Sequence, residues 1–356
     1  MCIIFLKCDA KVIAFPELCN IFAQKTDIKY MKKILGMGNA LTDILLQIES
    51  DEILLQLDLL KGGMMLIDTQ RAEEISAAVS KYSSLMATGG SASNTINGIT
   101  RLGAKAGFVG KIGKDEVGEF FHSDSLKNGV EPHLLVSNTP SGRCIVLVSP
   151  DSERTLCTYL GAACELEASD LSAEMFVGYD IFHIEGYLVQ NHDLIRTAVK
   201  LAKEAGLQVS LDLASYNVVE ANIDFLKEIV REYVDIVFAN EEEARAFTGK
   251  EPEEALIHIS DHCDIAVVKI GKEGSYIKAG DDHVQVKPRL ANAIDTTGAG
   301  DLYASGFLFG LAKGYSLEVC GKIGSLVSGN VVEVLGAKMT DEVWADIHAE
   351  IEKIIA

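Results

Sequence analysis

The chain has 356 residues, a length that favours one large domain or two of ordinary size and easily buries a hydrophobic core. With 48% hydrophobic and 24% charged residues, 31 Gly and 6 Pro, its composition is that of a globular α/β protein and excludes a disordered or collagen-like chain. Asp and Glu (52) exceed Lys and Arg (32), and the net charge of -20 argues against a broad surface for nucleic acid. An anionic ligand must therefore be held locally.

Eight cysteines without a C-x-x-C pair suit reduced thiols in the cytoplasm better than a disulfide framework or a zinc site. No apolar run approaches the roughly 20 residues that a membrane-spanning helix needs. Charged residues interrupt the apolar start of the chain and no small-residue cleavage site follows, so we expect no secretory signal. We expect residues 1–30 to be a non-catalytic extension and residues 31–356 to form a cytoplasmic domain that binds neither membrane nor nucleic acid.

Short apolar strands alternate with helical segments from Met31 onward, which is the pattern of a mostly parallel sheet covered by helices. The predicted strands are 34–37, 107–109, 181–184, 208–213, 235–238 and 265–270. The predicted helices are 93–102, 116–128, 193–205, 224–233, 241–247, 299–313, 317–334 and 341–355. Segments of period-two alternation predict a second, smaller sheet from 42–49, 64–67, 133–136, 143–148 and 154–159.

The segment Asp295-Thr-Thr-Gly-Ala-Gly-Asp301 immediately precedes an apolar helix. Small residues at a helix start leave backbone N–H groups unpaired, and the helix dipole adds partial positive charge, so an anion would sit well there. We predict that Asp301 takes a proton from an attacking hydroxyl while the amides of Gly298, Ala299 and Gly300 hold the transferring phosphoryl group. The alternative is an ordinary glycine-rich turn in which Asp301 complements the helix dipole, worth about 0.3 to 1 kcal/mol.

A second glycine-containing segment, Thr88-Gly-Gly-Ser-Ala-Ser-Asn94, also stands just ahead of a helix. Gly89 and Gly90 would let the backbone approach a ligand closely, and Ser91 and Asn94 offer donors and acceptors to a polyol. A simple serine N-cap is the alternative.

Asn39 and Asp43 stand four residues apart at the end of the first strand and can point the same way. A carboxylate is a good partner for vicinal hydroxyls, so the pair predicts contacts to an acceptor. The nearby Gly-x-Gly lacks the third glycine of a dinucleotide fingerprint, which makes NAD binding a weak hypothesis.

Asn240 and Glu243 lie where an apolar strand runs into a helix. They can serve as an N-cap and a dipole-complementing carboxylate, or position a water-clad Mg²⁺ that carries nucleotide phosphates. The turn after the strand 265–270, from Lys269 to Ser275, can lie along a nucleotide or close an ordinary hairpin.

In order and spacing these segments resemble the PfkB, or ribokinase-like, family of carbohydrate kinases over essentially residues 31–356, through signatures at 89–121 and 295–307. The resemblance implies a ribokinase-like α/β fold: a central, mostly parallel sheet flanked by helices, with a small β lid around 42–49, 64–67 and 133–160. It implies Asp301 as catalytic base and Gly298, Ala299 and Gly300 as the anion hole.

The resemblance also assigns residues to three binding roles. The acceptor site would comprise Asn39, Asp43, Gly63, Gly89, Gly90, Ser91, Asn94, Arg154 and Tyr187. The ATP contacts would be Asn240, Lys269, Gly271, Gly274 and Thr296, and Asn240 with Glu243 would organise Mg²⁺ through water. A monovalent cation such as K⁺ and a homodimer are left open.

Within the family, the segments 38–44, 89–94 and 154–161 look more like the adenosine kinase branch than like ribokinases. This resemblance predicts an ATP-dependent kinase of purine salvage that phosphorylates a primary hydroxyl of a nucleoside, adenosine to AMP. Apolar or aromatic residues should then cover the purine, and the candidates are Tyr187, Leu188, Met65 and Cys157. The alternatives are a kinase of ribose, fructose or a related sugar, and a catalytically silent nucleoside-binding relative.

Overall fold

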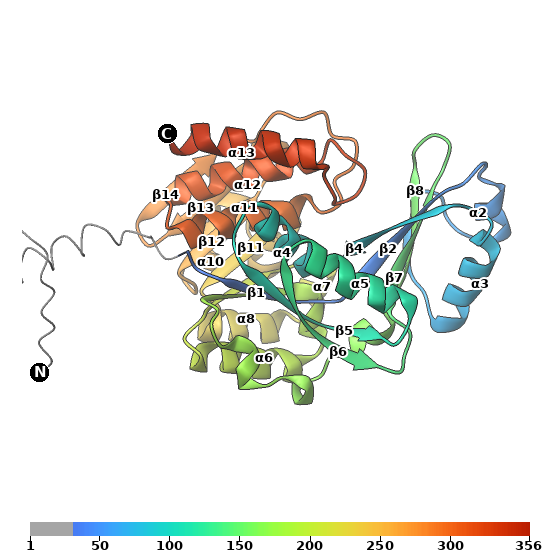
Figure 1. Cartoon of the computed structure of the whole chain (residues 1–356). Coiled ribbons are helices and arrows are strands. Elements are labelled where there is room, and N and C mark those ends of the chain that lie inside the picture. Colours follow the sequence, from blue (N-terminus) through green and yellow to red (C-terminus); the bar gives the residue numbers. More distant parts are fainter. Residues whose placement is uncertain (1–30) are drawn as a thin grey trace, which may run out of the picture. The chain divides into compact units, whose positions relative to one another are not determined.

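The computed structural model describes residues 31–356 (Figure 1). Its larger sheet has nine strands in the order β14-β13-β12-β11-β10-β9-β1-β5-β6. Neighbouring strands from β12 to β6 are parallel, while β13 and β14 add an antiparallel hairpin at one edge. The strands are β1 (Ile34–Met37), β5 (Ala106–Gly113), β6 (Val130–Ser137), β9 (Ile181–Glu185), β10 (Gln208–Asp212), β11 (Ile236–Asn240), β12 (Ile265–Lys269), β13 (Ser275–Ala279) and β14 (Asp282–Val286).

The central strands are apolar almost without interruption because helices cover both of their faces. In β11, for example, the four residues from Ile236 to Ala239 are fully buried. None of the helices between residues 31 and 356 has the length and apolar character to cross a membrane. The main helices are α4 (Ser91–Arg101), α5 (Glu116–Lys127), α6 (His192–Glu204), α8 (Ile223–Tyr233), α9 (Glu241–Thr248), α10 (Pro252–Ser260), α11 (Ala299–Lys313), α12 (Leu317–Val331) and α13 (Asp341–Ile355).

A second sheet has five strands in the order β3-β8-β7-β2-β4. One of its faces packs against α2 (Glu52–Gln56) and α3 (Thr69–Val79), which enclose a separate hydrophobic cluster that includes Leu46, Ile75 and Leu147. In Figure 1 these two short helices lie on the side of this sheet that faces away from the larger one. Its strands are β2 (Leu41–Gln47), β3 (Met64–Leu66), β4 (Ser84–Gly89), β7 (Gly142–Val148) and β8 (Arg154–Tyr159).

The mostly parallel α/β architecture is confirmed, but the assignment of 133–136 to the smaller sheet is wrong. These residues belong to β6, which pairs in parallel with β5 at the edge of the larger sheet. Helices cover only one face of this edge strand, so its apolar and polar residues alternate, as they do in a strand of a small sheet with one face in solvent. Strand β4 was not predicted, because its exposed Ser84, Leu85 and Met86 show no alternation.

Candidate active site

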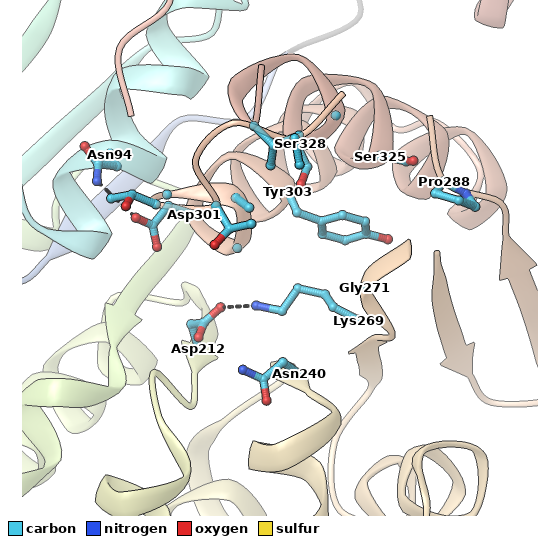
Figure 2. Close-up of a pocket in the computed structure, with 18 of the residues that line it drawn as sticks. Asn94, Asp212, Asn240, Lys269, Gly271, Pro288, Asp301, Tyr303, Ser325 and Ser328 are labelled. Carbon is cyan, nitrogen blue, oxygen red and sulfur yellow. Dashed lines mark hydrogen bonds and ion pairs between the residues drawn. The ribbon is translucent and has the colours of Figure 1, made fainter. Parts of the chain in front are cut away.

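Four neighbouring strands of the larger sheet each have a polar residue at their carboxyl end. These residues are Glu185 of β9, Asp212 of β10, Asn240 of β11 and Lys269 of β12. In open α/β sheets, ligands bind at the carboxyl ends of the parallel strands. Asp212, Asn240 and Lys269 line a cleft of about 890 Å³ there, which Figure 2 shows in close-up.

Asp301 lies in the first turn of α11 at the edge of this cleft. Its Oδ1 accepts a hydrogen bond from Ser91 Oγ at 2.7 Å, and its Oδ2 accepts one from Asn94 Nδ2 at 3.0 Å. Burial raises the pKa of Asp301 to about 6, although the hydrogen bonds from Asn94 and Ser91 oppose the rise. The site therefore holds an oriented carboxylate whose pKa is close to what a general base needs at neutral pH.

The turn before α11 has the backbone that an anion hole requires. Gly298 adopts a left-handed conformation, with φ of 75°, and a Cβ there would lie 2.6 Å from the Cβ of Ala337. The ammonium of Lys269 lies against the same turn, 3.1 Å from where a Cβ of Gly300 would be. Gly298, Ala299, Gly300 and Lys269 therefore line one end of the cleft, but the amide of Ala299, predicted to hold an anion, donates instead to the carbonyl oxygen of Thr296 at 3.1 Å.

Lys269 also donates to Asp212 Oδ2 at 2.9 Å, the contact drawn as a dashed line in Figure 2. Burial alone would raise the pKa of Asp212, but the charge of Lys269 lowers it, and Asp212 in turn raises the pKa of Lys269 against the effect of burial. Both groups are therefore charged at neutral pH, and Asp212 fixes the ammonium at the mouth of the anion hole.

Asn240 and Glu243 form a capping box at the start of α9. Asn240 Oδ1 accepts from the Glu243 amide at 2.8 Å, and the Glu243 carboxylate accepts from the Asn240 backbone and side chain, both at 2.7 Å. The interpretation of Asn240 as an N-cap is thus correct, and both residues also line the cleft. Burial, together with the charge of Asp212, raises the pKa of Glu243 to about 7. Within residues 31–356 no group of three or more His, Cys, Asp or Glu side chains is arranged to hold a metal ion.

Asp43 reaches the cleft from β2 of the smaller sheet. A Cβ at Gly89 would lie 2.6 Å from Asp43 Oδ1, and one at Gly90, where φ is 89°, would lie 2.2 Å from the carbonyl oxygen of Asn39. Only glycine fits at these two positions, which explains the pair in the sequence. Burial raises the pKa of Asp43 to about 6, against the nearby charges of Lys338 and Arg154.

On the face of the smaller sheet that carries Asp43, one row of paired residues holds Asp43 and Thr158 between Ala87 and Leu66 at its ends, and the next row is entirely apolar. Directly paired residues share a face, and Asp43 pairs with Cys144, which in turn pairs with Thr158. The apolar row lies two residues further along the strands and crosses all five of them. Leu85 and Met64, at its two ends, are 69% and 71% exposed. This row consists of Leu85, Leu45, Val146, Leu156 and Met64.

Arg154 of β8 joins the smaller sheet to the anion-hole turn through an ion pair with Asp295. The two side chains are only 10% and 11% exposed. Asp295 also accepts from the backbone amides of Thr297 at 2.9 Å and Gly336 at 2.8 Å. One carboxylate therefore fixes the turn and contacts the smaller sheet.

Most of the residues predicted for the site meet in the cleft. Its lining includes Asp43, Gly90, Ser91, Asn94, Tyr187, Asn240, Glu243, Lys269, Gly271, Gly274, Thr296, Gly298, Ala299, Gly300 and Asp301. Ser91 and Asn94, predicted to contact a polyol, instead direct their hydroxyl and amide to Asp301.

Four predicted residues are not part of the lining. Asn39 is 7% exposed and donates from its backbone and side chain to Glu185, whose pKa burial raises to about 7. Gly63 lies in the turn before β3, Gly89 lies behind Asp43, and Arg154 is bound to Asp295.

Of the side chains proposed to cover a purine, only Tyr187 is available in the cleft, where it is 41% exposed. Cys157 and Leu188 are buried, and Met65 packs against the hydrophobic cluster under α2 and α3. The apolar row of the smaller sheet, which was not predicted, does not belong to the cleft lining, and Val146 at its centre is buried.

Sequence reasoning also missed Asp212, Glu185 and Lys338. The first two could have been found from their positions at the carboxyl ends of predicted strands, where ligands gather. Lys338 lies in a loop without any local motif, so the sequence carries no signal for it.

Comparisons with known proteins agree with this geometry. A family model described as pfkB family carbohydrate kinase matches residues 57–343. The structure of an adenosine kinase from Sinorhizobium meliloti is 35% identical, with a TM-score of 0.78 over 90% of this chain and 99% of that one. A probable sugar kinase from Rhizobium etli CFN 42 is 34% identical, with a TM-score of 0.79 over the same shares.

Among curated proteins, the 5-dehydro-2-deoxygluconokinase of Bacillus subtilis is 29% identical over 282 residues, which are 75% of this chain and 85% of that protein. The two solved structures share the fold of this chain, while the names of the three relatives indicate different acceptors. The chain belongs to the PfkB family of carbohydrate kinases and is a kinase of the sugar or nucleoside type.

Proposed function

We propose that this chain is an adenosine kinase, which transfers the terminal phosphoryl group of ATP to the 5'-hydroxyl of adenosine and yields AMP. The observation that carries the proposal is the face of the smaller sheet, where the carboxylate of Asp43 is followed by an apolar row. A ribose would place its hydroxyls at Asp43, and a purine would lie against Leu45 and Leu156. The 35% identity with an adenosine kinase supports the same acceptor.

The proposed reaction is a direct phosphoryl transfer. Asp301, oriented by Ser91 and Asn94, accepts the proton of the acceptor hydroxyl as the oxygen attacks the terminal phosphorus. The amides of Gly298 and Gly300 and the ammonium of Lys269 stabilise the charge on the phosphoryl oxygens in a loose transition state.

Asn240 and Glu243 are the residues that would hold Mg²⁺ through its water molecules. Both line the cleft next to Asp212 and Lys269, and amide and carboxylate oxygens suit a hard cation that keeps its waters. When bound, Mg²⁺ supplies charge neutralisation for the nucleotide phosphates.

A panel of acceptors tests the proposal. With ATP and Mg²⁺, in buffers with and without K⁺, the products from adenosine, 2'-deoxyadenosine, ribose, fructose and a sugar acid are followed by mass spectrometry. We expect the highest kcat/KM for adenosine and a marked loss for 2'-deoxyadenosine, because a missing hydroxyl leaves Asp43 without its partner. A higher kcat/KM for any free sugar would contradict the nucleoside assignment.

A sugar kinase is the second candidate, favoured by the relative that is named 5-dehydro-2-deoxygluconokinase. A sugar acid would need a free cation beside Asp43. Arg154 is bound to Asp295, and the carboxylate of Asp43 in the cleft would repel the carboxylate of a sugar acid. The charges around the acceptor end therefore favour a neutral molecule over an acid.

A further inference from the structure

The carboxylate of Glu185, at the carboxyl end of β9, is buried where three segments of the chain meet. Its Oε1 accepts from the backbone amide of Asn39 at 2.9 Å and from the side-chain amide of the same residue at 2.6 Å. Its Oε2 accepts from the backbone amide of Ala92 at 3.0 Å. One side chain therefore joins the end of β9 to the connection between β1 and β2 and to the start of α4.

The carboxylate of Glu185 fits these contacts in its ionised form. All three partners are N–H groups, and an ionised carboxylate only accepts hydrogen bonds, whereas a protonated one would turn an O–H group toward one of these donors. A Cβ at Gly38 would lie 2.3 Å from Oε2, so the glycine leaves room for the carboxylate. The three hydrogen bonds offset part of the cost of removing the charge from water.

Helix α4 begins without a capping side chain of its own. Gly90 stands at the N-cap position, where φ is 89°, and has no side chain that could accept from the amides of the first turn. Ala92 is the second residue of the helix, and its amide is among those that a helix leaves unpaired. Glu185 supplies the missing acceptor from β9, and its negative charge suits the positive end of the helix dipole.

Neighbours of Ala92 in the first turn of α4 hold the proposed base. Ser91 donates its hydroxyl to Asp301 Oδ1 at 2.7 Å, and Asn94, which Figure 2 shows beside Asp301, donates its side-chain amide to Oδ2 at 3.0 Å. A continuous series of contacts thus runs from Glu185 through the first turn of α4 to Asp301.

We propose that Glu185 is a positioning residue of the kinase, which fixes the start of α4 and thereby the direction of the Asp301 carboxylate. The inference rests on the proposed phosphoryl transfer. Glu185 does not belong to the lining of the cleft, so it acts through the residues that it holds. Its contact with Asn39 fastens the connection that leads into β2 and Asp43, so one carboxylate holds the start of the helix and the start of the smaller sheet.

Glu185→Gln keeps the shape of the side chain and breaks the contact with α4. The single oxygen of the amide can accept from both groups of Asn39, and its nitrogen then faces the amide of Ala92, so that a donor meets a donor. We expect kcat to fall roughly tenfold, because a misdirected base removes the proton less efficiently. The Kd of a non-hydrolysable ATP analogue should stay within about twofold, since the printed partners of Glu185 are remote from the predicted ATP contacts.

A double-mutant cycle with Asp301→Asn distinguishes positioning from a contribution to stability. Glu185→Gln should lower kcat roughly tenfold when Asp301 is present and by less than about twofold in Asp301→Asn, where no base is left to orient. A loss that came only from a smaller folded fraction would be the same in both backgrounds. The kcat values are measured with the best acceptor at pH 8, above the pKa of about 7 to which burial raises the Glu185 carboxyl.

Asp115→Asn is the matched control. Asp115 also accepts three hydrogen bonds from two segments, one from the amide of Gly118 at 2.9 Å and two from the amide and hydroxyl of Ser141 at 2.8 Å and 2.5 Å. It caps α5 and does not belong to the lining of the cleft. Asp115→Asn should change kcat by the same factor, close to one, with and without Asp301→Asn.

Thermal unfolding of each variant reports folding. If Glu185→Gln does not fold, the cycle is carried out with Glu185→Asp, which keeps the charge but is shorter by one methylene group and should lose the contact with one of the two segments. Equal losses in the two Asp301 backgrounds would overturn the proposal, as would an unchanged kcat in a folded variant or the failure of both variants to fold. A wild-type protein without kinase activity, or an Asp301→Asn variant as active as wild type, would instead contradict the proposed function.

Discussion

Asp301 illustrates how one side chain acquires a chemical role from its neighbours. Ser91 and Asn94, both from α4, hold its two oxygens, and burial brings its pKa to about 6. The carboxylate is therefore fixed in direction and largely unprotonated at neutral pH, which are the two requirements of a general base.

Replacing Asp301 by Asn should lower kcat by about 10²- to 10⁴-fold, because the amide keeps the shape but accepts no proton. Binding of adenosine and of an ATP analogue, measured by titration calorimetry, should change little. A variant that keeps more than a tenth of the wild-type kcat would show that another group removes the proton.

For single residues, the sequence predicts a functional role only where the residue belongs to a local motif. Asp301, Asn240 and the glycines before α11 stand in short segments whose spacing suggests their chemistry. Glu185 meets the site through the tertiary fold, by accepting from the amides of Asn39 and Ala92. No spacing along the chain encodes such contacts.

Among the elements, the smaller sheet is joined to the turn before α11 through the pair Arg154–Asp295. A kinase that left its site open to water would transfer phosphate to water, so we expect this sheet to act as a lid over the acceptor. The buried ion pair would hold the lid next to the anion hole.

Removing the guanidinium in Arg154→Ala leaves Asp295 without its cation in a buried position, which is costly. We expect a lower kcat and a larger share of ATP hydrolysed without acceptor phosphorylation, measured as the ratio of ADP to AMP formed from ATP and adenosine. The control is Lys61→Ala, which breaks exposed ion pairs with Asp51 and Asp151 in the smaller sheet. Equal ratios of ADP to AMP in the two variants would contradict the proposal that the Arg154–Asp295 pair holds the lid next to the anion hole.

The elements themselves were predictable where the pattern was strong. Strand β1 and the first four residues of β11 are apolar, α11 is apolar over most of its 15 residues, and α13 keeps a helical period over its 15 residues. Strand β4 and the position of β6 depend on pairing with distant segments, which local alternation does not specify.

For the whole molecule, the lining of the cleft is drawn from residues between Asp43 and Val332. We propose that residues 1–30 take no part in catalysis, because the motifs that carry the proposed chemistry lie between Asn39 and Asp301 in the sequence. A chain that starts at Met31 should keep kcat and the KM for adenosine within about twofold of wild type, since it retains every residue given a role in the proposed reaction. Steady-state kinetics of the shortened chain decide this, and a tenfold loss with an unchanged melting temperature would assign these residues a role.

The double attachment of Asp295 has a consequence for how the two substrates communicate. Its carboxylate contacts both Arg154 of the sheet that would cover the acceptor and the turn that would receive the phosphates. A movement of the sheet on acceptor binding would therefore also change the free energy of nucleotide binding at the turn. Linkage then requires that adenosine tighten the binding of a non-hydrolysable ATP analogue by the same factor by which the analogue tightens adenosine. In Arg154→Ala that factor should approach one, which means that the two ligands would bind independently of each other.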